Sequence, residues 1–394
     1  MGTALLLGCM AAFPQSVVKL TQALVRIPSV NPDGDPGVDK TGEADVAAYV
    51  GDFLKHSGAE VVIEEVLPGR PNVIGRFRSE PANDGKPKPR IVFGPHLDTV
   101  GVGGMTIDPF GGEVREGKLW GRGACDTKGP MAAMLWALWE LRDELATLPV
   151  EVHFAGFMSE ESDQHGSRHF AKHHGKDYAF ALIAEPTDLK TVFKHKGCLW
   201  ADIETFGIAV HGSRPELGEN AIVKMAKLIK ALDADFRAQL ANCGDDEWLG
   251  RSTISLGMIR GGTRANITAD HCRLTVDIRY NPAVRDHGGP HELLKAFVAH
   301  LDPSAKVTPC GALSPCLDTS AEDPFVKSLV EHGAALTGAP WFCDAAFLAE
   351  AGVPAIAMGP GSIAQAHTKD EWIEIAELER GAEFWVRWLR GEGA

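Results

Sequence analysis

Five segments of this chain place histidine or carboxylate side chains where apolar stretches give way to loops. They are His96 and Asp98 after RIVFGP, Asp126 in the Gly-rich turn GRGACDTKGP, Glu160 and Glu161 after VEVHFAGFMS, Glu185 after FALIA, and His367 after VPAIAMGPGSIAQ. A single carboxylate of this kind is more often a helix cap or an ion-pair partner. Five segments together are hard to explain as caps, because burying so many carboxylates without a cation is costly. Imidazole and carboxylate ligands suit divalent metals of the zinc class, so we expect a fold that gathers these segments around metal ions.

The first half of the chain alternates between helical and strand patterns. Helical spacing runs over 17–25 and 45–57, and a long helix begins near Lys128 and continues through MAAMLWALWELRDEL. The segments NVIGRF, RIVFGPHLDTV, VEVHFAGFMS and YAFALIAEP have the β-branched and apolar content of buried strands. This alternation is typical of an α/β fold, with helices on both faces of a largely parallel sheet. The same rhythm returns after residue 303, with helices expected over 324–337 and 375–389.

The middle of the chain has a different character, and 394 residues are more than one hydrophobic core usually organises. Two strand-rich stretches, LWADIETFGIAV and HCRLTVDIRY, each feed a helix, at 220–240 and 291–300. This β-α-β-β-α-β rhythm predicts a small ferredoxin-like α+β domain. We therefore expect a discontinuous catalytic domain over 1–195 and 304–394, interrupted by an inserted domain over 196–303.

Charge and cysteine content limit the partners and the compartment. The formal net charge of −14 argues against nucleic acid, which requires a clustered basic surface. The apolar run in MGTALLLGCMAAFPQ is too short to span a bilayer and lacks the basic flank of a secretory signal, so we expect no membrane partner. A clipped export signal remains the alternative. Eight cysteines without a CxxC pair favour reduced thiols in the cytoplasm, and spacing alone does not show whether Cys310 and Cys316 pair.

Taken together, these segments resemble the M20 metallopeptidase/deacylase family. PHLDTV is similar to the first box of the family, GRGACDTKGPMAA to the second, EES to the third, AEP to the fourth and QAHTKDEW to the C-terminal one. The resemblance covers essentially the whole chain. It departs from the family at Pro95, where glycine is usual, and this leaves His96 intact. The resemblance implies a zinc-peptidase-like catalytic domain built on a mixed sheet, and an inserted lid or dimerisation domain.

The resemblance also implies two metal ions that share Asp126. His96 and Glu185 would complete the ligands of one ion, and Glu161 and His367 those of the other. Zinc is the expected ion, and cobalt suits the same ligands.

Two further acids have expected roles beside the metals. Asp98 lies two residues after His96, so in an extended segment both side chains point to one face and Asp98 can orient the imidazole. The alternative is an Asx cap before Thr99. Neighbouring residues in an extended segment point apart, which would let Glu161 bind metal while Glu160 faces the substrate. Glu160 is the expected general base, and a second metal ligand is its alternative.

Substrate recognition is expected to involve the inserted domain. The resemblance assigns His211 the task of crossing from the partner of a homodimer to polarise the scissile carbonyl. It assigns Asn266 and Arg279 to a clamp for the substrate α-carboxylate, which a guanidinium can hold with two parallel hydrogen bonds.

Three functions are compared. The main hypothesis is hydrolysis of the amide bond of an N-acyl-L-amino acid, because GPGSIAQAHTKDEW is most similar to the C-terminal box of acetylornithine deacetylases. Asp344 would then contact a cationic substrate end, or act as a helix cap. A carboxypeptidase or dipeptidase that releases a C-terminal amino acid is the alternative within the family. A non-catalytic ligand-binding or scaffold relative is disfavoured, because Glu160 and every ligand are present.

Overall fold

The computed structural model describes residues 13–34, 36–82, 84–311 and 313–392. The apolar stretch over residues 1–12, on which the alternative of a clipped export signal depends, lies outside them. The chain forms two compact units. The first comprises Met1–Thr191, Ala321–Leu336 and Cys343–Ala394, and the second Val192–Ser320 and Thr337–Phe342. The second unit therefore includes residues 192–195, 304–320 and 337–342, which the sequence pattern assigns to the catalytic domain.

A mixed sheet organises the first unit. Six of its nine strands lie in the first unit, in the order β1-β2-β6-β3-β7-β15. Their bounds are β1 Glu60–Leu67, β2 Arg70–Arg76, β6 Glu151–Gly156, β3 Arg90–Pro95, β7 Phe180–Ala184 and β15 Ala355–Ala357. Strands β6, β3, β7 and β15 run parallel, whereas β2 is antiparallel to both β1 and β6. The predicted α/β fold is confirmed. Because the parallel strands point their carboxyl ends to one edge, the segments after β3, β6 and β7 meet there.

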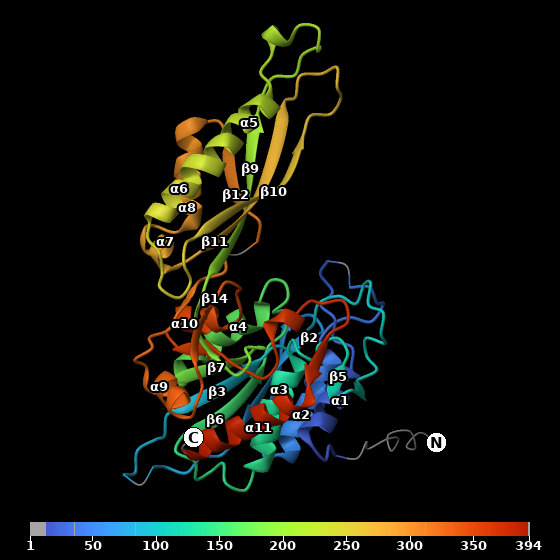
Figure 1. Ribbon diagram of the computed structural model, residues 1–394, viewed down its shortest axis with the longest axis vertical. Coiled ribbons are helices and arrows are strands. Elements are labelled where there is room, and N and C mark those ends of the chain that lie inside the picture. The colour runs from blue at the N-terminus through green and yellow to red at the C-terminus, as the bar shows by residue number, and fades with distance from the viewer. Residues whose placement is uncertain (1–12, 35, 83, 312, 393–394) are drawn as a thin grey trace. The chain divides into compact units, whose positions relative to one another are not determined.

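Helices cover this sheet, which explains why its central strands are buried along most of their length. The helices of the first unit are α1 Val17–Val25, α2 Ala44–His56, α3 Lys128–Glu140, α4 His165–His174, α9 Pro324–Glu331, α10 Ala345–Glu350 and α11 Ile375–Arg390. Helices α3 and α11 lie side by side, and α1 contacts both of them (Figure 1). Helices α4 and α10 form another pair. Within the described residues, no helix is both long and apolar enough to cross a membrane.

A small three-stranded sheet that the sequence analysis did not predict joins two distant parts of the first unit. It consists of β4 Glu113–Arg115, β5 Lys118–Trp120 and β16 Trp372–Glu374, in the order β16-β5-β4. The hairpin between β4 and β5 turns through Glu116 and Gly117, which both have positive φ, as a two-residue hairpin turn requires. Strand β16 pairs antiparallel with β5, with Trp372 opposite Trp120. The loop after β5 is thus fixed beside the segment that leads into β16.

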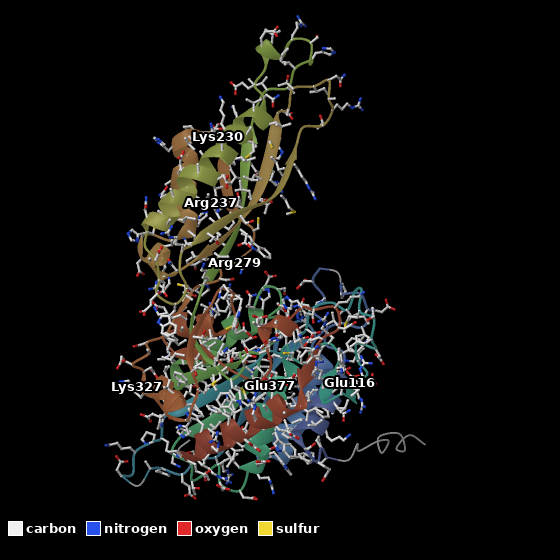
Figure 2. All side chains as sticks on the ribbon, viewed as in Figure 1. Glu116, Lys230, Arg237, Arg279, Lys327 and Glu377 are labelled. Atoms are coloured by element: carbon white, nitrogen blue, oxygen red, sulfur yellow. The ribbon has the colours of Figure 1, made fainter. Side chains whose placement is uncertain are left out.

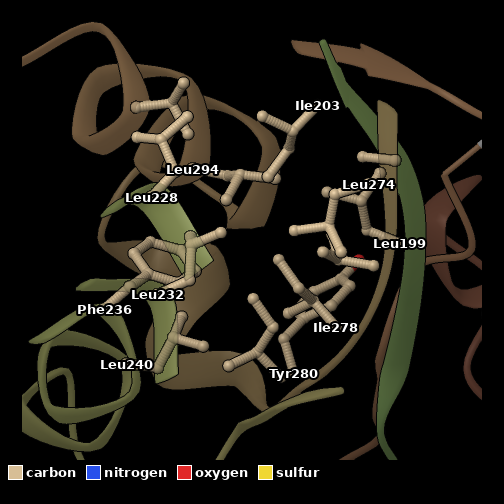
Figure 3. Packing of buried hydrophobic residues seen from close by; sticks show 14 of the residues in the cluster. Leu199, Ile203, Leu228, Leu232, Phe236, Leu240, Leu274, Ile278, Tyr280 and Leu294 are labelled. Atoms are coloured by element: carbon tan, nitrogen blue, oxygen red, sulfur yellow. The ribbon is translucent and has the colours of Figure 1, made fainter. Parts of the chain in front are cut away.

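The second unit contains a four-stranded antiparallel sheet in the order β10-β11-β9-β12. Its elements are β9 Gly197–Phe206, α5 Ala221–Ala231, α6 Arg237–Asn242, β10 Thr253–Gly261, β11 His271–Tyr280, α7 Pro282–Asp286, α8 Pro290–Leu301 and β12 Lys306–Pro309. Leu199, Ile203, Leu274 and Ile278 alternate along β9 and β11 and pack against α5 and α8 (Figure 3). The order β9-α5-β10-β11-α8-β12 follows the predicted β-α-β-β-α-β rhythm. Also in this unit, β8 Thr191–His195 pairs antiparallel with β13 Leu317–Asp318.

Three predicted helices differ from the observed ones. The long helix expected from Lys128 through Leu145 is shorter, because α3 ends at Glu140. The helix expected over 324–337 is wrong in its second half: α9 ends at Glu331, and β14 follows at Leu336–Ala339. Gly333, with φ +97°, stops this helix, since a left-handed residue is a common helix terminator. The helix expected over 220–240 is interrupted by a π-helical turn over Leu232–Phe236 between α5 and α6.

Candidate metal centre

Asp126 lies between two histidines from distant parts of the first unit. His96 follows β3, Asp126 lies in the turn that leads into α3, and His367 lies between β15 and β16. The Nε2 of His96 is 3.1 Å from Oδ1 of Asp126, and the Nε2 of His367 is 3.4 Å from Oδ2. Each carboxylate oxygen therefore faces a different imidazole. This is the arrangement that a carboxylate bridging two cations requires.

Two glutamates lie close to these residues. Oε2 of Glu161 lies 3.0 Å from Nε2 of His367, and ligand atoms of His96, Asp126 and Glu161 all lie within 4.8 Å of one another. Glu185 follows β7, and the hydroxyl of Thr127, beside Asp126, donates to the carbonyl of Ala184 at 2.7 Å. Glu185 is thereby kept beside the turn that carries Asp126.

The donor set fits divalent cations. Among the residues that the structure describes, Oε1 of Glu161 and Oε1 of Glu185 are buried without a hydrogen-bond partner. A buried carboxylate oxygen without a donor is costly, and a cation would satisfy both. Two histidines and three carboxylates are also ligands that zinc-class ions accept.

The pKa values of these groups follow from their burial and their crowding. Burial raises the pKa of Glu161 to about 7, and the charge of Asp126 adds to the effect. Burial also raises the pKa of Glu185 well above its usual range. For Asp126 burial acts in the same direction, but hydrogen bonds from His367 and His96 outweigh it and lower the pKa. Hydrogen bonds from His367 to Asp126 and to Glu161 raise the pKa of His367 to about 10. The crowded carboxylates thus favour the protonated form of His367 wherever no metal ion neutralises their charge.

Asp98 contacts both sides of this site. The Nδ1 of His96 lies 2.9 Å from the backbone carbonyl of Asp98 and 3.6 Å from its Oδ1. An Nδ1–H donated to this carbonyl leaves the lone pair of Nε2 for a metal. The carboxylate of Asp98 also accepts hydrogen bonds from the backbone N–H groups of Glu160 at 3.0 Å and Glu161 at 3.1 Å. Asn31, which the sequence analysis did not single out, donates to it at 2.8 Å.

Glu160 and Glu161 lie in a turn, not in the extended segment that the sequence analysis assumed. The preceding Ser159 has φ +67°, and its N–H donates to the buried carboxylate of Glu43 at 3.1 Å. Alternation of side chains along a strand therefore does not explain how Glu161 could bind metal while Glu160 faces the substrate. The turn itself must direct the two side chains differently. Burial raises the pKa of Glu160 well above its usual range, and the charges of Glu185 and Glu161 add to this while His96 opposes it.

Asp344 is buried in the first unit and does not cap a helix. It occupies the N-cap position of α10 but makes no side-chain capping hydrogen bond, so the cap interpretation is wrong. Its Oδ1 accepts a 2.5 Å hydrogen bond from the hydroxyl of Ser167. Burial raises the pKa of Asp344 to about 7.

The three expected substrate-recognition residues lie in the second unit, at two separate places. His211 pairs with Ile267 in an isolated bridge, and the N–H of Gly212 donates to the carbonyl of Asn266 at 2.8 Å, so His211 and Asn266 are neighbours. Arg279 (Figure 2) lies near the far end of β11, eight residues after His271. Eight steps along a strand, each about 3.3 Å, separate these ends by about 26 Å. The guanidinium of Arg279 is paired with Asp277 at 2.9 Å.

Two histidines and several carboxylates converge at the carboxyl edge of a helix-covered sheet, an arrangement that is typical of metal-dependent hydrolases. The chain belongs to peptidase family M20/M25/M40, whose model matches residues 92–391. The resemblance drawn from the sequence boxes is thereby confirmed, and the chain is a hydrolase that acts on amide bonds.

Curated and solved relatives agree with this assignment. An acetylornithine deacetylase from Proteus mirabilis is 30% identical over 369 residues, which cover 92% of this chain and 93% of that protein. A tripeptidase from Staphylococcus aureus superposes with a TM-score of 0.75 at 22% identity, covering 96% of this chain and 98% of the other. A dinuclear metal-binding M20 peptidase from Bacillus subtilis has a TM-score of 0.67 at 15% identity, covering 95% and 96%. The two solved structures establish the likeness of the fold.

Proposed function

We propose that this protein hydrolyses the amide bond of an N-acyl-L-amino acid of the N-acetylornithine type, with two divalent metal ions, most simply zinc. The observation that carries the proposal is that the two oxygens of Asp126 face His96 and His367 separately. The similarity to the Proteus mirabilis acetylornithine deacetylase supports the acyl amino acid as substrate.

The ligands divide into two sets around Asp126. His96 and Glu185 would hold one ion, and Glu161 and His367 the other. When bound, such ions polarise a carbonyl oxygen and lower the pKa of water from about 15.7 towards about 7. Glu160 takes the proton of the attacking water and delivers it to the nitrogen of the leaving amine. Asp98 keeps His96 in the required tautomer and holds the turn of Glu160 and Glu161 in place.

A homodimer would supply the remaining groups. His211 and Asn266 lie before the start of β11, and Arg279 lies about 26 Å along that strand from its start, so one small substrate is not expected to reach both places in a single copy. A second copy that contributes His211 resolves this, with His211 stabilising the oxyanion of the substrate and Arg279 binding its α-carboxylate. All seven cysteines in the described residues, Cys310 and Cys316 included, are free. Free thiols support a reducing compartment such as the cytoplasm.

The experiment is a substrate panel with the metal content measured on the same sample. We expect about two metal ions per chain and release of acetate from N-acetylornithine, abolished by exhaustive chelation and restored by zinc or cobalt. Dipeptides and acylglutamates test the carboxypeptidase alternative, in which a C-terminal amino acid is released instead. Metal-loaded protein that hydrolyses none of these substrates would favour a ligand-binding relative.

A further inference from the structure

Glu371 is a fully buried carboxylate that receives four hydrogen bonds from one loop. Its Oε1 accepts from the backbone N–H groups of Cys125 at 2.7 Å and Asp126 at 2.8 Å. Its Oε2 accepts from the backbone N–H of Gly123 at 3.0 Å and from the guanidinium of Arg122 at 2.8 Å. One side chain thus satisfies three backbone donors and one buried cation of the loop that carries the bridging aspartate.

The backbone around Glu371 is fixed to the same loop. Its carbonyl accepts from the N–H of Gly121 at 3.0 Å, and the next residue, Trp372, opens β16, which pairs with β5 directly before the loop. Four residues before Glu371 lies His367. Glu371 therefore lies between the paired strand β16 on one side and the segment that carries His367 on the other.

The hydrogen bonds of Glu371 indicate that it supports a metal ligand and is not a ligand itself. Its hydrogen bonds go to the backbone N–H of Asp126, whereas the side-chain oxygens of Asp126 face His96 and His367. Glu371 also has a cationic partner, since the guanidinium of Arg122 is only 4% exposed and lies against it. It needs no metal to compensate its charge. Its position controls where the Asp126 carboxylate is presented.

We propose that Glu371 is a positioning residue that sets the bridging carboxylate of Asp126 against His367, and with it the affinity for the metal pair. The inference rests on the proposed dinuclear function. Residues that orient metal ligands typically contribute about 10–100-fold to metal affinity. An amide in place of the carboxylate would direct an NH₂ group at N–H donors, and at least one of the four hydrogen bonds would be lost.

The test compares Glu371→Gln with the double variant Arg122→Met/Glu371→Gln. The single variant leaves the guanidinium of Arg122 buried without its carboxylate, which destabilises the fold. The double variant removes that unpaired charge, so we expect its unfolding midpoint to recover. In both variants we expect zinc affinity, measured by competition with a chelator, to fall about 10–100-fold. The visible spectrum of the cobalt-loaded protein should also change, because it reports ligand geometry.

Glu151→Gln is the matched control. Glu151 is likewise a carboxylate paired with an arginine, at 2.7 Å from Arg90, but it is only partly buried and begins β6, at the opposite end of that strand from Glu161. It should bind zinc as the wild type does. Zinc affinity that recovers together with stability in the double variant would overturn the positioning role. If the wild type binds two metals but hydrolyses no acyl amino acid, the proposed function fails, while lower zinc affinity in both Glu371 variants still supports this inference.

Discussion

Replacing Glu160 with glutamine tests the proton transfer directly. The amide keeps the shape of the side chain but accepts no proton from water. The backbone of the turn should persist, because the N–H of Glu160 donates to Asp98 at 3.0 Å and its carbonyl accepts from the side chain of Gln164 at 2.8 Å. No metal ligand is altered in the proposed sets. The variant therefore separates loss of a base from loss of the metals.

The expected magnitude follows from the general-base role. A positioned general base typically contributes a factor of about 10²–10⁴ to the rate, or about 3–5 kcal/mol of activation free energy. Burial and the neighbouring Glu185 and Glu161 raise the pKa of Glu160, which makes it a stronger base than a surface glutamate. We expect the loss of kcat to lie at the upper end of this range, with KM changed much less.

The assay measures kcat and KM for N-acetylornithine together with the metal content of each sample. Asp163→Asn, three residues along the same turn and exposed, is the control for altered charge nearby. Glu160→Ala should keep its metal and lose turnover to a similar extent. A fully metal-loaded Glu160→Gln protein with a rate within about threefold of the wild type would remove Glu160 from the base role.

Three further predictions concern stability, pH and substrate affinity. Arg70→Met leaves the carboxylate of Glu43, which is fully buried and 2.6 Å from the guanidinium, without its cation, so we expect a loss of about 3–5 kcal/mol in urea unfolding; a loss below about 1 kcal/mol would contradict this. Burial lowers the pKa of His153 from 6.5 to about 4, so the unfolded chain binds a proton that the folded one refuses, and stability should fall as pH drops through this window. His153→Phe should remove up to about 3 kcal/mol of that decline, and an unchanged acid slope would refute it. Arg279→Lys should raise KM for the acyl amino acid with little change in kcat, since lysine lacks the paired donors; an equal KM would exclude the clamp.

Much of the fold and of the metal centre was predictable because it depends on local signals. The apolar strands that precede His96, Glu161 and Glu185 are recognisable from their composition, and parallel strands bring their carboxyl ends to one edge. The β-α-β-β-α-β order of the inserted domain was also predictable from a local signal. Strands β9 and β11 alternate apolar and polar residues along ten positions each.

Other features depend on contacts that no local pattern encodes. Strands β4, β5 and β16 have three residues each, too few for a periodicity to be recognised. Glu371 reaches the backbone of Asp126 across 245 positions of the sequence, and its neighbours in QAHTKDEW give no sign of that partner. The turn at Ser159 likewise depends on Glu43, 116 positions away. The sequence indicated Glu371 only as a member of the C-terminal box and gave no role for it.

Because β16 must pair with β5 before the loop of Asp126 has all its hydrogen bonds, the order of synthesis matters for metal loading. The ribosome releases His96, Asp126 and Glu161 long before His367 and Glu371, while the second unit, whose sheet lies within residues 192–320, can fold as soon as it emerges. An unfinished chain therefore contains His96, Asp126 and Glu161 before it contains His367 and Glu371. We therefore expect capture of metal ions to be a late event of maturation, coupled to the docking of the segment that ends in α11.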